Sequence, residues 1–180
     1  KSVLWAVGGF KIYINGSKTI YENIASYYQN GGLREFDFNF MSTVYERPFE
    51  VVYVEDVNDM PEEKGCSVPA GGFLKGNRVG FDAGGSDIKI SAVVDGEVIF
   101  SQEVIWLPKL NEDINYHYEH IYNAMMLAID KMGGKCDGIG ISTAGVIIGN
   151  RPMVSSLFIK VPKADFEKVK GVYINTCERI

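Results

Sequence analysis

The segment GFDAGGSDIKISAVVDGEVIF, residues 80–100, contains apolar runs separated by two glycine-containing turns. The connection from Asp82 to Asp87 carries two consecutive glycines, and Asp95-Gly96 is a typical dipeptide of a β-hairpin turn. The pattern predicts three strands, at Arg78–Asp82, Ile88–Val94 and Glu97–Ile105. Consecutive strands joined by such short turns pair antiparallel, so we expect a three-stranded meander.

The chain after this meander alternates helix and strand patterns. Ile121, Met125 and Ile129 recur at helical spacing before Gly133-Gly134, which predicts a helix and its end. The predicted elements are a helix at Tyr116–Met132, strands at Gly138–Ser142 and Val154–Phe158, and a closing helix from about Ala164 or Gly171 to Ile180. The order strand, strand, strand, helix, strand favours an α/β fold over residues 76–180, namely the opening of a ribonuclease-H-like half-domain.

The first 75 residues have a different, mixed α+β pattern. The predicted elements are a strand at Phe10–Ile14, a helix that begins near Thr19 and stops at Gly31-Gly32, and strands at Arg34–Tyr45 and Phe49–Val54. Thr19 and Glu22 have the spacing of a capping box. We therefore expect residues 1–75 to form a small α+β domain with a three-stranded sheet and one helix. The glycine-containing segment 65–77 places the division from the second domain near residue 75.

Two groups of aromatic side chains leave alternatives open. Phe36, Phe38 and Phe40 alternate like the inner face of a sheet, and the competing interpretation is a platform on which nucleic-acid bases stack. His117 and His120 are three residues apart near the start of a predicted helix. They either belong to a polar helix face or bind a metal ion together.

Composition narrows the classes of function. The 180-residue chain has 46% hydrophobic residues and a formal net charge of −5, which disfavours affinity that comes from neutralising nucleic-acid phosphates. No apolar run approaches the roughly 20 residues of a membrane helix, and the first residues lack a signal-peptide pattern, so we expect no membrane association and a cytoplasmic location. Cys66, Cys136 and Cys177 lack the spacing of a zinc site, and we expect reduced, mostly core thiols.

The double-glycine turn has the composition of an anion site. Glycines that tolerate positive φ let backbone N–H groups point inward toward a phosphate. Asp82, at the end of the first strand, is placed to hold a magnesium ion through water, because Mg²⁺ bound to phosphates needs only one or two carboxylates. Ser86 adds a hydroxyl donor, and Lys89 supplies a positive charge if strand alternation is kept. The plainer interpretation is an ordinary hairpin turn without a ligand.

These residues resemble the ROK family of sugar kinases and sugar-responsive repressors, whose opening motif is a D-x-G-G-[ST] loop in the actin/hexokinase/Hsp70 ATPase superfamily. A second segment, DGIGISTAGVI at residues 137–147, is similar to the family's strand and turn beside the sugar cleft. The segments GFDAGGSDIK, FSQEVIW, YHYEHI and ISTAGVIIGNRPMVSSLF resemble a branch with an extra N-terminal domain. The resemblance covers about Arg78 to the last residue.

The resemblance implies ATP and magnesium as cofactors, a sugar as substrate, and transfer of the γ-phosphoryl group to a sugar hydroxyl. The implied nucleotide-binding residues are Asp82, Gly84, Gly85, Ser86, Asp87 and Lys89, and the implied sugar-binding residues are Ser142, Thr143, Ala144 and Gly145. Ser86-Asp87 stands where the family commonly has Thr-Lys, and Ala144 where it has proline.

The family's catalytic aspartate and its histidine and cysteine zinc motif have no counterpart in this chain. We therefore expect the front part of a longer protein, inactive by itself, with no catalytic residue of its own. Two other functions stay open, a non-enzymatic sugar-responsive regulator and an ATPase coupled to a partner protein. Association of identical chains also stays open.

Overall fold

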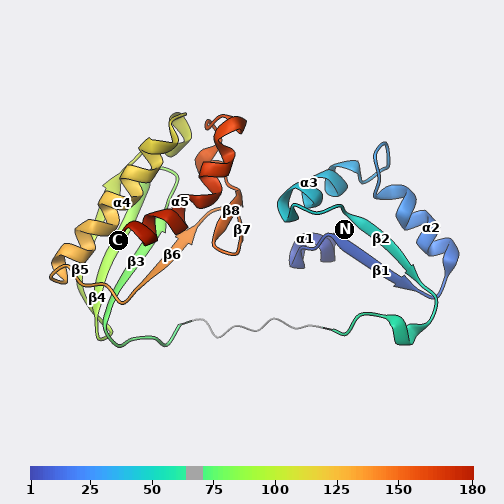
Figure 1. The fold of residues 1–180 in the computed structure, drawn as a ribbon, viewed down its shortest axis with the longest axis horizontal. Coiled ribbons are helices and arrows are strands. Elements are labelled where there is room, and N and C mark those ends of the chain that lie inside the picture. Colours follow the sequence, from blue (N-terminus) through green and yellow to red (C-terminus); the bar gives the residue numbers. More distant parts are fainter. Residues whose placement is uncertain (64–70) are drawn as a thin grey trace. The chain divides into compact units, whose positions relative to one another are not determined.

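The computed structural model describes residues 1–63 and 71–180, and it is a mixed α/β structure of two compact units, Lys1–Val68 and Pro69–Ile180 (Figure 1). The sequence analysis placed the division near residue 75, and in the structure the division comes before that residue. Cys66 lies outside the described residues.

The first unit contains a two-stranded parallel sheet with helices between its strands. Its elements are α1 (Ser2–Val7), β1 (Lys11–Asn15), α2 (Lys18–Tyr27), α3 (Glu35–Tyr45), β2 (Glu50–Val54) and a 3-10 turn (Val57–Asp59). β1 pairs with β2 over its whole length. Ser17 caps α2 by accepting a hydrogen bond from the Ile20 amide, so the predicted capping box at Thr19 is wrong.

The predicted strand at Arg34–Tyr45 is wrong, because the segment forms helix α3. The alternating pattern that suggested a strand also places Phe36 and Phe40 four residues apart on one helix face. Their rings stack with centroids 5.7 Å apart, and the Trp5 ring lies tilted against Phe40 with a centroid distance of 5.1 Å. Phe38 lies on the buried side with the small core of this unit. The three-stranded sheet with a single helix is therefore wrong for the described part of this unit.

The second unit is built on a four-stranded sheet of order β5-β4-β3-β6. Its elements are β3 (Asn77–Ala83), β4 (Asp87–Val94), β5 (Glu97–Ile105), α4 (Ile114–Lys131), β6 (Gly138–Thr143), β7 (Val146–Ile148), β8 (Arg151–Val154), α5 (Phe166–Arg179) and 3-10 turns at Pro108–Leu110, Ser156–Phe158 and Lys163–Asp165. The meander β3-β4-β5 is antiparallel, and β6 pairs parallel with β3. The predicted meander is confirmed.

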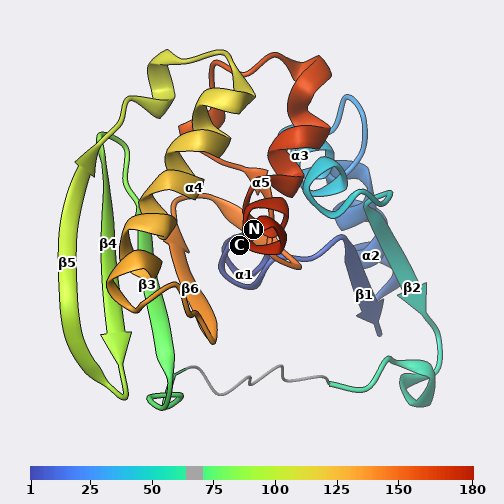
Figure 2. The same ribbon diagram turned by 60° about the vertical axis from the view of Figure 1, so that its left-hand side comes forward.

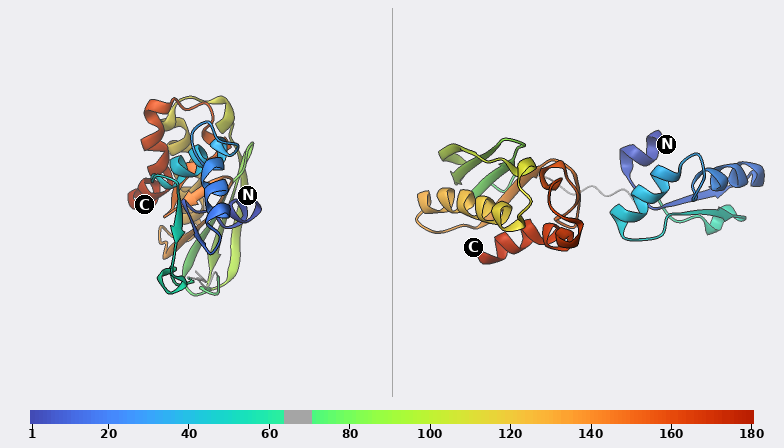
Figure 3. Two further views of the ribbon diagram at one scale, coloured as in Figure 1. Left: turned by 90° about the vertical axis from the view of Figure 1, so that its right-hand side faces the viewer. Right: turned by 90° about the horizontal axis from the view of Figure 1, so that it is seen from above.

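Both long helices of the second unit lie on the same side of this sheet (Figures 2 and 3). Alternate residues of β3 and β4 are buried under them, as the period of two in a strand requires. The core joins sheet residues such as Phe81 and Ile90 to Ile121 and Met125 of α4 and Val172 of α5. The opposite face of the sheet carries Gly80, Asp82 and Lys89, and it is here that polar residues gather.

The predicted strand at Val154–Phe158 is also wrong. β8 ends at Val154, and Ser155 then caps a 3-10 turn by accepting a hydrogen bond from the Leu157 amide. Leu157 and Phe158 are both buried in the main core. The apolar residues of this segment are buried in a short turn and not in a strand. The sequence pattern misled because an apolar run indicates burial without distinguishing a buried turn from a buried strand.

None of the helices in the described residues is both long enough and apolar enough to span a lipid bilayer.

We expect Ile121→Ala to lower the free energy of unfolding of the second unit by about 2–5 kcal/mol, because it removes fully buried methyl groups and leaves a cavity. Urea denaturation followed by Trp106 fluorescence, in a Trp5→Phe background, measures this. The matched control is Ile99→Ala at a half-exposed position of β5, which should cost about 1 kcal/mol or less. Equal losses for both variants would contradict the assigned core.

Candidate functional site

Three strands bring Asp82, Lys89 and Ser142 together on the sheet face that α4 and α5 leave free. Asp82 lies opposite Lys89 in the antiparallel pair β3–β4 and opposite Ser142 in the parallel pair β3–β6. All three side chains line an open groove of about 510 Å³. The structure therefore joins residues from the two separate sequence motifs, although 60 residues separate Asp82 from Ser142.

The floor of this groove is made of small residues in one row across the sheet. Gly140, Gly80, Ser91 and Ser101 are successive cross-strand partners on β6, β3, β4 and β5. A Cβ atom on Gly80 would lie 2.6 Å from the Ser91 Oγ atom, so a side chain there requires its neighbour to move. The sheet backbone is consequently accessible next to Asp82.

The double-glycine turn is tight, and one of its amides is already used. The Gly84 N–H donates to the Asp87 carbonyl oxygen at 2.9 Å, and a Cβ on Gly84 would lie 2.6 Å from that oxygen. Neither Gly84 nor Gly85 has a positive φ, so the expected use of left-handed backbone is wrong and close approach is the reason for glycine at position 84. Among the described residues, the Gly85 and Ser86 amides donate no hydrogen bond.

Trp106 holds this turn from the side, a role that the sequence analysis did not assign. Its buried indole Nε1 donates to the Gly84 carbonyl at 2.9 Å, and its backbone amide donates to the Ser86 carbonyl at 3.1 Å. The indole ring contacts the His117 ring edge-on, with centroids 6.1 Å apart. The turn is therefore anchored through its carbonyl groups, which leaves the amides of Gly85 and Ser86 available.

The charged groups beside the turn are paired with one another. Lys89 forms an ion pair with Asp87, and the Ser86 hydroxyl donates to the Asp87 carboxylate at 2.9 Å. The hydrogen bond from Lys89, followed by that from Ser86, lowers the pKa of Asp87. Asp87 in turn raises the pKa of Lys89, with smaller contributions from Glu103 and Asp82. Lys89 is thus a cation that is already paired with Asp87, and an anionic ligand competes with Asp87 for it.

The second motif is divided between the two faces of the sheet. Ser142 lines the groove with Asp82, whereas the Thr143 hydroxyl lies 2.7 Å from the Tyr173 hydroxyl on the helix side. Burial raises the pKa of Tyr173, and the hydrogen bond with Thr143 opposes that shift. Thr143 and Tyr173 line a second cavity, of about 740 Å³, to whose wall Ser142 also contributes. Strand alternation explains why Thr143 does not line the Asp82 groove, because neighbouring side chains of a strand point to opposite faces.

Ala144 and Gly145 form the turn between β6 and β7. Gly145 has φ +129°, and a Cβ there would lie 2.1 Å from the Val154 carbonyl oxygen. The hairpin β7–β8 therefore accounts for this glycine by itself, whether or not a ligand contacts it.

The two histidines are part of the scaffold. The ring nitrogens of the fully buried His117 lie 2.9 Å and 3.0 Å from the carbonyl oxygens of Asp113 and Pro108. His120 Nδ1 lies 2.8 Å from the Tyr116 carbonyl. Within residues 1–63 and 71–180, no group of three or more His, Cys, Asp or Glu side chains is arranged to hold a metal ion. A joint metal site on this histidine pair is therefore not supported.

Comparison with known proteins adds no family assignment: no family model matches the chain, and no significant match is found among curated proteins.

We expect Trp106→Phe to accelerate hydrogen exchange of the Gly84 amide by roughly fivefold, since it removes a hydrogen bond worth about 1 kcal/mol while keeping an aromatic ring in the core. Exchange followed by NMR checks this. Trp5→Phe is the matched control, because it removes an indole hydrogen bond to Asp37 in the other unit. An unchanged Gly84 rate in Trp106→Phe would show that the indole does not anchor the turn.

Proposed function

We propose that the second unit binds the phosphates of ATP with magnesium, as the first half of a ribonuclease-H-like, actin-type nucleotide-binding domain similar to that of ROK sugar kinases. The observation that carries the proposal is the alignment of Asp82, Lys89 and Ser142 on one open groove. The phosphate motif and the sugar-cleft motif of the resemblance thus meet at one place.

The strand arrangement supports the finer fold class. An antiparallel meander whose first strand pairs parallel with the strand after a helix is the topology that the sequence pattern predicted for this class. The two long helices lie on one side of the sheet (Figure 2). Asp82 lines an open groove on the other side, where a ligand can reach it. Asp82 and Ser142 both lie near the carboxyl ends of parallel strands, where α/β sheets commonly bind ligands.

The residues present fit a triphosphate with its metal ion. The unbonded amides of Gly85 and Ser86 lie in the turn between β3 and β4 and are donors for phosphate oxygens. Lys89 supplies a positive charge on the same groove as Asp82. Asp82 is the one carboxylate that lines this groove among the described residues, and Mg²⁺ commonly uses one or two carboxylates while it keeps several waters. When bound, the metal neutralises phosphate charge that develops during transfer.

We further propose a sugar hydroxyl as the acceptor of the phosphoryl group, on the strength of the resemblance at residues 137–147. In this arrangement Ser142 is the residue of that motif that shares a groove with Asp82. The described residues contribute phosphate positioning and charge, and we assign none of them as the general base. Sugar kinase action and partner-coupled ATP hydrolysis both need the nucleotide site, whereas a purely sugar-responsive regulator does not.

We expect Asp82→Asn to weaken binding of Mg²⁺·ATP to this chain by about tenfold or more, because loss of the carboxylate removes a charge-assisted interaction of about 1.5–3 kcal/mol. Lys89→Met should weaken binding both with and without magnesium, since the lysine contacts phosphate rather than the metal. Isothermal titration calorimetry, with and without Mg²⁺, separates the two effects.

The matched control is Asp130→Asn, which removes an exposed carboxylate on α4, away from the groove. It should leave ATP affinity unchanged. Equal weakening by Asp82→Asn in the absence of magnesium would contradict the metal role. Absence of any ATP binding by the unmodified chain would count against the nucleotide site itself.

A further inference from the structure

Two cysteines far apart in the sequence line the same cavity of the second unit. Cys136 belongs to the connection between α4 and β6, and Cys177 lies in the last turn of α5. Both contribute to the wall of a cavity of about 690 Å³, together with Ile129 and Ile139. Cys177 is exposed and Cys136 is half-buried, so the expectation of mostly core thiols fails for Cys177.

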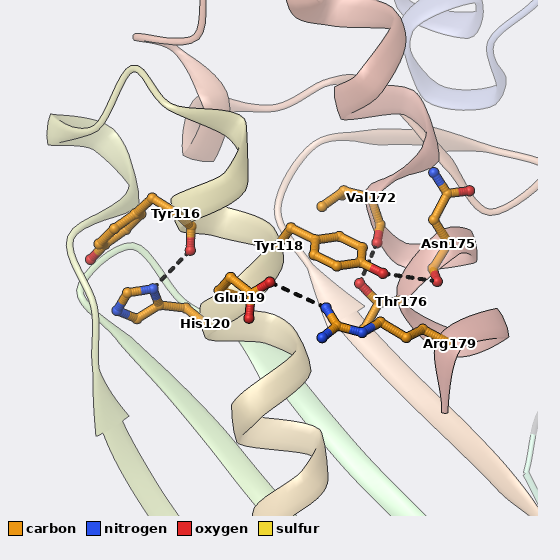
Figure 4. A network of polar contacts seen from close by, with 8 residues as sticks. All are labelled: Tyr116, Tyr118, Glu119, His120, Val172, Asn175, Thr176 and Arg179. Carbon is orange, nitrogen blue, oxygen red and sulfur yellow. Dashed lines mark hydrogen bonds and ion pairs between the residues drawn. The ribbon is translucent and has the colours of Figure 1, made fainter.

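Polar contacts join α5 to α4 (Figure 4). Cys177 belongs to this stretch of α5. Arg179 donates to the Glu119 carboxylate at 3.2 Å, and its guanidinium lies 3.9 Å from the centre of the Tyr122 ring. The Tyr118 hydroxyl donates to the Asn175 carbonyl at 3.4 Å. These contacts lie on both sides of Cys177 in the sequence of α5, so the helix end does not depend on the thiol for its placement.

The environment of each thiol is consistent with a reduced pair. The Cys136 Sγ donates to the Gly138 carbonyl at 3.5 Å. Burial raises the pKa of the Cys177 thiol, and the neighbouring Cys136 raises it further. The influence of Cys136 on the pKa of Cys177 agrees with the shared cavity in placing the two thiols near one another. Because the thiolate is the reactive form, Cys177 reacts slowly at neutral pH and faster as pH rises.

We propose that Cys136 and Cys177 form a reversible intramolecular disulfide when the protein meets a low-molecular-weight disulfide such as oxidised glutathione. The exposed Cys177 thiolate attacks one sulfur of the oxidant, breaking its S–S bond and releasing one glutathione thiolate, which takes up a proton. Cys136 then loses its proton and displaces the second glutathione. Two protein thiols are oxidised, and one glutathione disulfide is reduced to two glutathione thiols.

The bond would tie the end of α5 to the connection that leads into β6. It closes a covalent loop through β6, β7, β8 and α5, so it restricts the unfolded chain and stabilises the folded unit. Cys177 also lines the cavity beside Thr143 and Tyr173, so the same bond fixes one wall of that cavity. The inference does not depend on nucleotide binding.

The test uses the whole 180-residue chain in a Cys66→Ser background, so that two cysteines remain. Oxidised glutathione at pH 8.5 should yield a monomer that has lost two hydrogen atoms by mass spectrometry, with Cys136 and Cys177 joined in one peptide pair. Its melting temperature should rise by several degrees and return to the starting value on addition of dithiothreitol. The rate should increase roughly tenfold per pH unit below the Cys177 pKa.

Single variants distinguish the internal bond from simple modification. Cys136→Ser should accumulate one stable glutathione adduct on Cys177 and show no rise in melting temperature. Stable adducts in the two-cysteine protein, or disulfide-linked dimers in place of the internal bond, would overturn the proposal. A melting temperature that rises equally in Cys136→Ser would overturn it as well.

Discussion

The pairing of β3 with strands on both sides is the constraint on which the second unit depends. β3 is antiparallel to β4 and parallel to β6, and one register fixes every cross-strand neighbour of Asp82 at once. The same register sends Val79, Phe81 and Ala83 into the core. A shift by one residue would exchange the two faces, exposing the apolar set and burying Asp82. The register of β3 with its two neighbouring strands therefore determines both the burial of the core and the geometry of the candidate site.

Sequence patterns predicted β3, β4, β5, α4 and β6 of the second unit well, because the patterns of these elements are unambiguous. The meander has short turns, and α4 has apolar residues on one stripe and an Asp113 cap that accepts from the Asn115 amide. The alternation in β3 and β4 matches a sheet with one covered face. In contrast, EFDFNF in α3 satisfies the strand period and the four-residue helical spacing equally, and tertiary contacts with Trp5 and Phe49 accompany the helix. The local sequence pattern alone does not show which of the two structures these contacts favour.

The candidate site was predictable in its residue types and not in its contacts. The order of acid, glycines and hydroxyl indicated a turn with exposed amides, and the amides of Gly85 and Ser86 carry no hydrogen bond among the described residues. Nothing in the sequence links Trp106 to Gly84, because that hydrogen bond spans the meander. The sequence analysis also did not predict the Lys89–Asp87 ion pair, although the two residues lie on one side of β4 at positions i and i+2.

The alternation of β6 limits how a single ligand engages the second motif. Ser142 faces the Asp82 groove, Thr143 is engaged with Tyr173 on the other side, and Gly145 lies in the turn beyond. A ligand lying flat on the groove contacts Ser142 without reaching Thr143. A ligand that contacts Ser142 together with Gly145 must instead lie across the carboxyl end of β6. Because β3 is parallel to β6, Asp82 lies near that same end of the sheet. In the proposed function, the phosphate at the turn after β3 and the hydroxyl at the turn after β6 would therefore approach each other from neighbouring strands.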